Sequence, residues 1–199
     1  MPETVKLSCA CGEVQGSLEV HQKDSFHVEC LCCDCQQFSA ELGNSEMLKS
    51  YGGTEILQTY PSYVTITKGQ NNISALQLTP KSLWRHYTSC CQTPIGNMMN
   101  GKNSPFIGVP IYFMQFESDE QKDKILGPIT MRCFAKYGKD NKPADAHDTF
   151  PISFMPKIMW FLLKGILTKK SRPSPYPREA TTMRKAESIA GWGLYEIQK

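Results

Sequence analysis

The residues best able to do chemistry in this 199-residue chain are its nine cysteines, eight of which stand in short groups. The groups are Cys9-Ala-Cys11-Gly12, Cys30-Leu-Cys32-Cys33-Asp-Cys35 and Cys90-Cys91, while Cys133 stands alone. Zinc takes four ligands in a tetrahedron, and closely spaced cysteines supply two thiolates from one tight loop while a distant loop completes the set. The spacing therefore predicts metal sites built from thiolates.

Disulfides and plain buried thiols could also account for so many cysteines. The N-terminus lacks the basic and apolar regions of a secretory signal, and no run of about 18 apolar residues occurs. We therefore expect a cytoplasmic protein in a reducing compartment, where disulfides are rare. Plain burial remains the alternative for Cys33 and, above all, for Cys133.

The elements that must position these cysteines are expected to be short β-strands. Between residues 4 and 135, β-branched and aromatic residues alternate with turn signals such as Gly12, Gly16 and Gly53. The predicted strands are residues 4–8, 13–20, 25–30, 63–67, 73–79, 83–88, 106–112 and 129–135. Two short helices are predicted at residues 36–42 and 46–50, the second after Ser45 as N-cap. The fold class is therefore mostly β.

Three parts are predicted along the chain. Residues 1–135 form the zinc-binding β-domain, the polar residues 136–150 form a linker, and residues 151–199 hold a C-terminal amphipathic helix and an extended basic tail. The helix, at residues 156–170, is broadly apolar and carries few lysines. We expect it to pack on the β-domain, and the alternative is contact with a membrane surface or a partner.

The basic residues of the tail are the second feature of the charge pattern. Between Lys157 and Lys185 eight Lys and Arg residues face one acid, Glu179, although the net charge of the chain is only +3. The tail lacks the interleaved aromatic residues of a stacking platform, so no nucleic acid is expected as a partner. The oligomeric state is not predicted.

The order of the cysteine groups resembles that of the glutathione-dependent formaldehyde-activating enzyme family, which includes centromere protein V. The resemblance rests on Cys9-x-Cys11-Gly12, then Cys30-x-Cys32-x-x-Cys35-Gln36, then Cys91-x-Thr93-Pro94-Ile95, and it covers roughly residues 5 to 135. It looks closest to a bacterial-type branch, as the segments 42–44 and 83–97 suggest. The resemblance implies a zinc-binding β-tent of antiparallel sheets with up to two zinc ions.

The resemblance also implies how the cysteines divide between the two ions. Cys9, Cys11 and Cys91 correspond to ligands of a structural zinc. Cys30, Cys32 and Cys35 correspond to a second set that leaves the fourth zinc position open for a thiol or water.

Two departures from the family pattern change this picture. Thr88 stands where the family has a fourth structural cysteine, and Cys90 is the expected substitute. A turn must then present both Cys90 and Cys91, because adjacent residues of a regular strand face opposite ways. Leu31 stands where many relatives have a histidine, so a proton-transfer role at that position is not expected.

The activity implied by the resemblance is a carbon–sulfur lyase reaction on a glutathione adduct of formaldehyde, or on a similar adduct of another thiol or small aldehyde. Arg85 is a candidate to pair with a glutathione carboxylate, and His27 and His86 are candidate helpers near the cysteine groups. The alternative is a non-catalytic zinc β-domain that binds a thiol or a protein partner.

Overall fold

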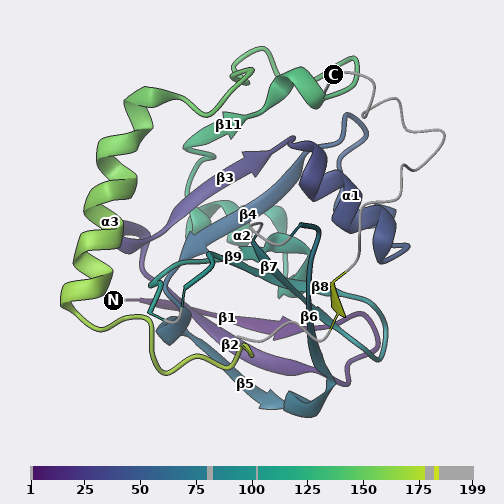
Figure 1. Cartoon of the computed structure of the whole chain (residues 1–199), viewed down its shortest axis with the longest axis vertical. Helices are drawn as coiled ribbons and strands as arrows, with labels where there is room; N and C mark the ends of the chain where they lie inside the picture. Colours follow the sequence, from purple (N-terminus) through teal and green to yellow (C-terminus); the bar gives the residue numbers. More distant parts are fainter. Residues whose placement is uncertain (1, 80–82, 102, 178–181, 184–199) are drawn as a thin grey trace.

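The computed structural model describes residues 2–79, 83–101, 103–177 and 182–183, and Figure 1 shows two β-sheets with helices at their edges. The strands are β1 (Glu3–Ser8), β2 (Gln15–Val20), β3 (Phe26–Cys30), β4 (Thr54–Thr59), β5 (Val64–Lys68), β6 (Ile73–Gln77), β7 (Trp84–Thr88), β8 (Pro94–Met98), β9 (Ile107–Pro110), β10 (Met114–Gln115), β11 (Met131–Cys133) and β12 (Thr182–Met183). The helices are α1 (Cys33–Glu41), α2 (Asp119–Leu126) and α3 (Met155–Leu167).

The smaller sheet has the strand order β10-β1-β2-β5 and is antiparallel throughout. Its strands alternate in burial, since Val5 and Leu7 of β1 and Leu18 and Val20 of β2 face the core. This period of two is what a sheet with one wet face requires. The sheet closes on the larger one through a shared apolar core that includes Leu57, at 1% exposed, and other buried residues of β8 and β9.

The larger sheet has the order β11-β3-β4-β9-β8-β7-β6-β12. Its inner pairs are antiparallel, whereas its two outer pairs, β11 with β3 and β12 with β6, are parallel. The prediction of a mostly β fold of antiparallel sheets with a C-terminal helix is confirmed, with these two parallel pairs as the difference. Both arise because the chain returns to the sheet edges late in the sequence.

Four strands, β4, β8, β10 and β12, were not predicted, and the first two were missed for identifiable reasons. β4 is buried on both faces, so its sequence does not alternate. β8 contains Pro94 and Gly96, which argue against a central strand. A Cβ on Gly96 would lie 2.9 Å from a methyl carbon of Ile107 and 3.1 Å from the ring of Tyr176, so this strand has no space for a larger residue there.

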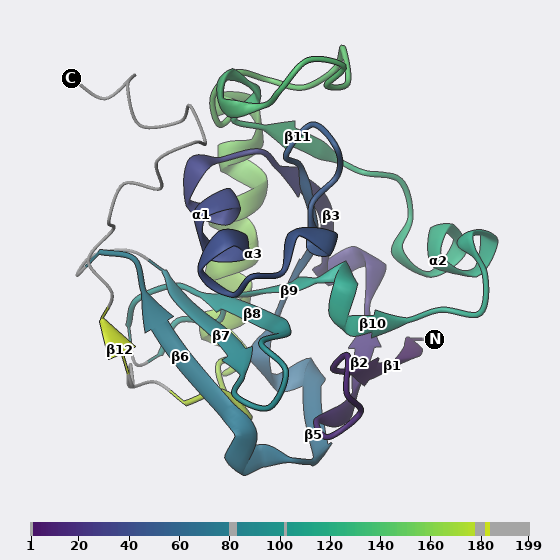
Figure 2. The same cartoon turned by 90° about the vertical axis from the view of Figure 1, so that its right-hand side faces the viewer.

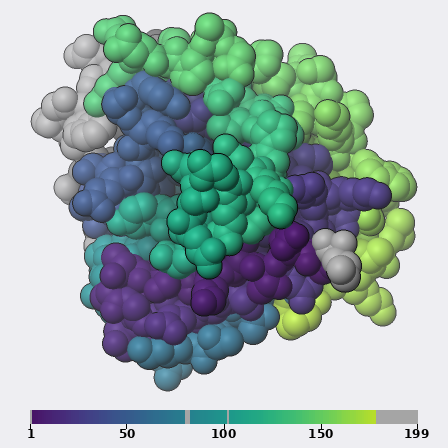
Figure 3. Space-filling view, turned by 180° about the vertical axis from the view of Figure 1, so that it is seen from behind, coloured from purple at the N-terminus to yellow at the C-terminus, as the bar shows by residue number. Residues whose placement is uncertain are grey.

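The helices differ from the prediction at three places. α1 begins at Cys33, three residues earlier than predicted, and the predicted helix at residues 46–50 is wrong, because only a 3-10 turn forms at Ser45–Met47. α2 was not predicted. It begins after the N-cap Ser118, whose hydroxyl accepts a hydrogen bond from the Gln121 amide. It lies on the face seen in Figure 3, above the N-terminal strands.

α3 lies along the left edge of the molecule in Figure 1 and therefore at the back of the view in Figure 2, behind α1. Its inner stripe docks through Phe161 and Gly165, and the Phe161 ring stacks on Tyr60 with 4.3 Å between ring centroids. A Cβ on Gly165 would lie 2.6 Å from the Tyr60 ring, so the helix is held very close to the body. The helix packs on the β-domain as expected, but only through this narrow stripe, because six other apolar residues of α3 stay exposed. In the described part of the chain no helix has the length and apolar character needed to cross a bilayer.

The segments on either side of α3 also contact the body. Within residues 136–150, the His147 amide donates to the Arg132 carbonyl and the Lys139 amide to the Tyr51 carbonyl. After α3, the Tyr176 hydroxyl donates to the Ile95 carbonyl at 3.0 Å. The three-part division of the chain stays a prediction, and residues 178–181 and 184–199 of the basic tail lie outside the described residues.

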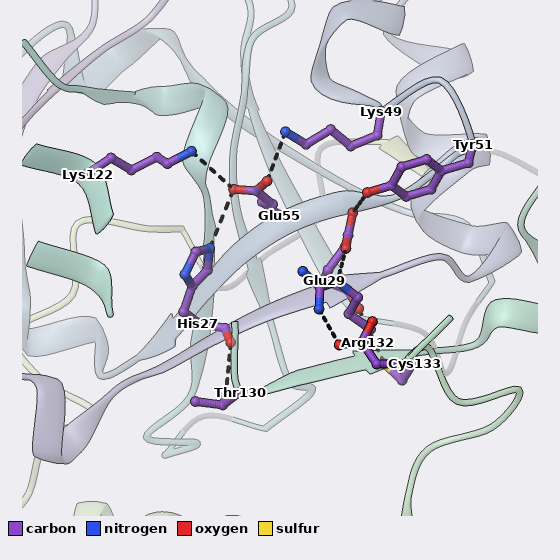
Figure 4. Close-up of polar contacts among 10 residues, drawn as sticks. His27, Glu29, Lys49, Tyr51, Glu55, Lys122, Thr130, Arg132 and Cys133 are labelled. Atoms are coloured by element: carbon purple, nitrogen blue, oxygen red, sulfur yellow. Dashed lines mark hydrogen bonds and ion pairs between the residues drawn. The ribbon is translucent and has the colours of Figure 1, made fainter. Parts of the chain in front are cut away.

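Strand β3 separates two kinds of chemistry. Its register with β4 and β11 gives the sheet one face of apolar and cysteine side chains and one face of charged side chains. The first face holds Val28, Cys30, Ile56 and Cys133. The second face holds His27, Glu29, Glu55 and Arg132. Figure 4 shows this charged face.

Glu29, at 1% exposed, accepts hydrogen bonds from Tyr51 at 2.6 Å and Arg132 at 2.8 Å. Glu55 lies 2.9 Å from Lys49 and 3.5 Å from His27. Each buried carboxylate therefore has cationic or hydrogen-bonding partners, as burial demands.

Glu55 gives this face a pH dependence that can be measured. The hydrogen bond from His27, followed by that from Lys49, lowers the pKa of Glu55 from 4.5 to about 2 although burial opposes the shift. A depressed pKa stabilises the fold above the unfolded pKa, so this contribution is lost as the pH falls from about 4.5 toward 2. We expect Glu55→Gln to lower the free energy of unfolding at pH 7 by about 1–3 kcal/mol. The loss relative to wild type should shrink at pH 3, as measured by urea unfolding.

The matched control is Glu117→Gln, which changes an exposed glutamate. It should leave stability at pH 7 within about 0.5 kcal/mol of wild type. An equal loss for Glu55→Gln at pH 7 and below pH 2.5 would contradict the role assigned to the carboxylate charge.

Candidate metal centres

The first group of cysteines joins two turns that belong to different sheets. The turn after β1 carries Cys9 and Cys11, and Gly12 closes it with a φ of 75°, a conformation that glycine adopts without strain. The turn between β7 and β8 carries Cys90 and Cys91. This four-sulfur group, Cys9, Cys11, Cys90 and Cys91, has all its sulfur atoms within 4.8 Å of one another.

The distances in the four-sulfur group suit a tetrahedral ion. Sγ of Cys11 lies 3.6 Å from that of Cys9 and 3.4 Å from that of Cys90, and the Cys9 and Cys90 sulfurs are 4.0 Å apart. A tetrahedron with Zn–S arms of about 2.3 Å has edges of about 3.8 Å. The β7–β8 turn presents both Cys90 and Cys91, with their sulfurs 3.9 Å apart, so Cys90 stands where a fourth ligand is needed.

Two buried threonines hold this group in place. The Thr93 hydroxyl accepts from the Ala10 amide at 3.0 Å and lies 3.2 Å from the Cys91 sulfur, so it ties the two turns together. Burial opposes ionisation of Cys91, but hydrogen bonds from Thr88 and Thr93 lower its pKa to about 5. Burial and the hydrogen bond with Cys11 raise the pKa of Cys90 to about 12. The group thus favours one thiolate by itself, and a bound cation would favour all four.

A hollow of about 480 Å³ lies beside this group, lined by the β1–β2 turn together with Tyr112 and Gln115. Cys11 and Cys90 are exposed, whereas Cys9 is buried. The four-sulfur group therefore lies at the surface.

The second group forms where β3 passes into α1. Cys30 ends the strand, Cys32 is the N-cap, and Cys35 lies in the first helical turn, where its amide donates to the Cys32 sulfur at 3.4 Å. The positive end of the helix dipole favours negative charge at this place. This three-sulfur group, Cys30, Cys32 and Cys35, has its sulfur atoms within 4.8 Å of one another. Among the described residues, no other His, Cys, Asp or Glu ligand atom lies that close to all three.

Arg85 of β7 brings a positive charge to the three-sulfur group. Its side chain is 2% exposed, with one guanidinium nitrogen 3.8 Å from the Cys35 sulfur and another 3.6 Å from the Asp34 carboxylate. Asn97 accepts from the same guanidinium at 3.4 Å, and the Phe38 ring lies 5.4 Å beneath it. The guanidinium thus faces Cys35 and Asp34 in the interior, whereas the sequence prediction paired it with a glutathione carboxylate.

The surroundings of Cys30 and Cys35 shift the pKa values of these two thiols in opposite directions. Hydrogen bonds from Cys30 and Cys32, with the charge of Arg85, hold the pKa of Cys35 well below its ordinary value against the effect of burial. The pKa of Cys30 is raised, first by its hydrogen bond with Cys133 and then by Cys32 and Cys35. Thiolate charge therefore gathers on Cys35, next to the guanidinium.

Residues 1–187 match the sequence family described as "Family of unknown function (DUF6151)". The chain belongs to this family. No curated protein matches the DUF6151 chain. The crystal structure of a Rhodobacter sphaeroides protein is similar with a TM-score of 0.43 and 15% sequence identity, covering 62% of this chain and 96% of that one.

Other predicted helpers of this DUF6151 chain lie away from the sulfurs. His27 is on the charged face of β3, opposite Cys30, and hydrogen-bonds the Gly127 carbonyl at 2.9 Å. His86 donates to the Pro177 carbonyl at 2.7 Å and faces Tyr176. Cys33 lies outside the three-sulfur group, and Cys133 is buried beside Cys30 in the parallel β11–β3 pair.

The residues that sequence reasoning missed are the partners of the sulfurs. Asp34 and Asn97 flank Arg85, and the hydroxyls of Thr88 and Thr93 flank Cys91. The threonines stood within three residues of Cys91, a signal that was available. Asn97 gave no such signal, because only the fold brings it to the three-sulfur group.

Removing one sulfur from either group should remove one equivalent of bound metal. We expect Cys11→Ser and Cys32→Ser each to lose an ion, because three or two sulfurs hold it less tightly than the full group. Elemental analysis of protein purified without added metal measures this directly. Cys11→Ser should also lower the melting temperature, since its group joins the two sheets.

Cys33→Ser is the matched control, because Cys33 lies in the same segment but outside the group. It should retain the full metal content. Separate Cys90→Ser and Cys91→Ser variants should each lose the ion of the four-sulfur group. A folded wild-type protein free of every transition metal would contradict the assignment of both centres.

Proposed function

We propose that the chain binds zinc at both cysteine groups and that the three-sulfur group takes a small thiol of the glutathione type for carbon–sulfur chemistry with formaldehyde or another small aldehyde. The single observation that carries the proposal is the convergence of three sulfurs without a fourth ligand among the described residues. A cytoplasmic setting belongs to the same proposal, because all nine cysteines are free thiols.

Zinc is the metal that this donor set favours. Both groups offer sulfur alone, and soft thiolates select zinc or copper(I) over hard cations such as magnesium and calcium. A site with four protein ligands is typical of a structural zinc, and a site with three leaves a position for an outside molecule. On this basis the four-sulfur group is the structural centre and the three-sulfur group the thiol centre.

The charge balance of the three-sulfur group favours thiol chemistry. Three thiolates and one divalent cation sum to −1, Arg85 would bring the sum to 0, and the Asp34 carboxylate on the exposed side of the guanidinium returns it to −1. Zinc in such a group would supply one kind of chemistry, which is to keep a bound thiol deprotonated at neutral pH. The electron-rich sulfur set makes the centre a poor Lewis acid, so activation of water is the weaker alternative.

The reaction balances without an oxidant or reductant. A thiolate adds to the aldehyde carbon, so a carbon–sulfur bond forms while the π bond of the carbonyl breaks and its electron pair moves to oxygen. The proton that the thiol released then returns to this oxygen to give a hemithioacetal. The reverse reaction breaks the same bond. The positive charge of Arg85 and the positive end of the α1 dipole both stabilise negative charge on the cysteine sulfurs of the three-sulfur group during this reaction.

The positions of the histidines favour a second candidate, a module that binds a thiol without turning it over. His27 and His86 both hydrogen-bond elsewhere, and Leu31 occupies the position between Cys30 and Cys32. Proton transfer would then have to come from solvent or from the thiol itself. The two candidates differ in turnover and share the same thiol site.

Cobalt substitution tests the thiol site directly, because thiolate-to-cobalt absorption bands respond to each sulfur ligand. Glutathione at millimolar concentration should change these bands in wild type and in the control Cys33→Ser, and should leave them unchanged in Cys35→Ser. No response in wild type would sink the thiol site. A response without formaldehyde-dependent turnover would decide for the binding module.

Arg85→Gln tests the charge balance. Loss of the buried positive charge should weaken metal binding at the three-sulfur group by about tenfold or more, since a charge-assisted contact of this kind contributes about 1.5–3 kcal/mol. Competition with a chromophoric chelator measures the affinity. Arg85→Lys keeps the charge and should recover part of the loss, whereas equal affinities in all three proteins would refute the role of the charge.

A further inference from the structure

The outer face of α3 carries an unusual concentration of exposed apolar side chains. Of the eight large hydrophobic residues that are exposed in the described part of the chain, seven lie between Ile152 and Leu167, and Met99 is the eighth. Trp160 is 65% exposed and Leu167 70%. Large apolar surface of this kind on one element marks a site of contact with a partner or a membrane.

The exposed residues form one continuous face. At about 100° per residue, the six on α3 occupy roughly 140° of the helix circumference. They are Met155, Met159, Trp160, Leu163, Ile166 and Leu167, and they define the α3 outer face. The docked stripe around Phe161 and Gly165 occupies the opposite side. The outer face is therefore a second apolar surface and not the rim of the docked one.

The orientation of this face is fixed by the contacts beneath it. The Tyr60 hydroxyl donates to the Phe161 carbonyl at 2.8 Å, and Lys164 forms an ion pair with Asp24. Gly165 sits so close to Tyr60 and Pro105 that a Cβ would clash with both. The helix cannot turn its outer residues inward without giving up these contacts, so the outer face stays exposed. Figures 1 and 3 show the helix itself at the edge of the molecule.

The charged residues of α3 and of the segments on either side of it all have one sign. From residue 149 to residue 177 the sequence contains five basic residues and no acid. They are Lys157, Lys164, Lys169, Lys170 and Arg172. Lys164 is paired with Asp24, and the exposed Lys157 and Lys169 leave positive charge beside the apolar residues. A face of this kind is complementary to a surface with apolar depth and negative charge.

We propose that the α3 outer face binds the surface of a membrane rich in anionic phospholipids, with the helix lying in the plane of the interface. An interfacial helix buries its apolar face at the boundary of headgroups and acyl chains while its lysines contact the headgroups. Thirteen residues span about 20 Å, short of the roughly 30 Å of a bilayer core, so the helix lies on the membrane and does not cross it. A second copy of the chain fits less well, because it would bring two basic patches together.

Vesicle sedimentation tests the proposal on the full chain with its metals. Wild type should pellet with vesicles of phosphatidylcholine and phosphatidylserine, less with phosphatidylcholine alone, and less at high salt. The double variant Leu163→Gln, Ile166→Gln should bind at least about tenfold more weakly, because two exposed apolar side chains no longer enter the lipid. Lys157→Gln, Lys169→Gln should lose binding only to the anionic vesicles.

Met99→Gln is the matched control, because Met99 is an exposed apolar residue that lies outside residues 152–167. It should bind as wild type does, and all variants should keep the wild-type melting temperature and metal content. Failure of wild type to bind anionic vesicles, or undiminished binding by the Leu163→Gln, Ile166→Gln variant, would overturn the proposal. So would a wild-type dimer in sedimentation velocity that the same double variant dissociates in the absence of vesicle binding. Each readout is independent of thiol chemistry.

Discussion

Repulsion between crowded sulfurs is the constraint on which the junction of the two sheets depends. The β1–β2 and β7–β8 turns bring four cysteine sulfurs within 4.8 Å of one another. Two thiolates at about 4 Å repel by about 4 kcal/mol at an effective dielectric of 20. The sheets can therefore stay closed with these groups ionised only if a cation lies among them, and without one most of the thiols must remain protonated. In either protonation state, the shared core and the Thr93 hydroxyl hold the two turns together.

The same need to balance charge governs the larger sheet. The register of β3 with its neighbours directs Cys30 and Cys133 to one face and Glu29 and Glu55 to the other. The carboxylates are satisfied by Tyr51, Arg132, Lys49 and His27, so they place no negative charge beside the thiolates. Arg85 is the cation directed at the cysteine side. The sheet thus separates the carboxylates and their partners on one face from the cysteines and Arg85 on the other.

The sequence predicted what depends on local pattern and left out what depends on the fold. Cysteine spacing showed the short local groups, the family resemblance divided these groups between two sites, and alternation was enough to find strands such as β1 and β2. Strand β4 escaped because burial on both faces removes alternation. Helix α2 escaped because its apolar stripe is short, although Ser118 and Gln121 carry an N-cap signal. The sequence offered Arg85 only as a partner for a glutathione carboxylate and did not predict its burial. Its burial follows from Asp34 and Cys35, about fifty residues away in sequence.

The hydroxyl of Thr93 accepts from the Ala10 amide of one hairpin and lies beside the Cys91 sulfur of the other. Neither hairpin carries more than two of the four sulfurs, so each alone is a weak chelator. Folding places the two pairs at a high effective concentration for the same ion. By thermodynamic reciprocity, an ion bound there would strengthen the closure of the sheets by the same free energy that closure adds to its affinity. A chelator that removed such an ion would therefore weaken the contact between the two sheets. Conversely, a packing defect elsewhere in the sheet junction would lower the affinity of the four-sulfur group for metal.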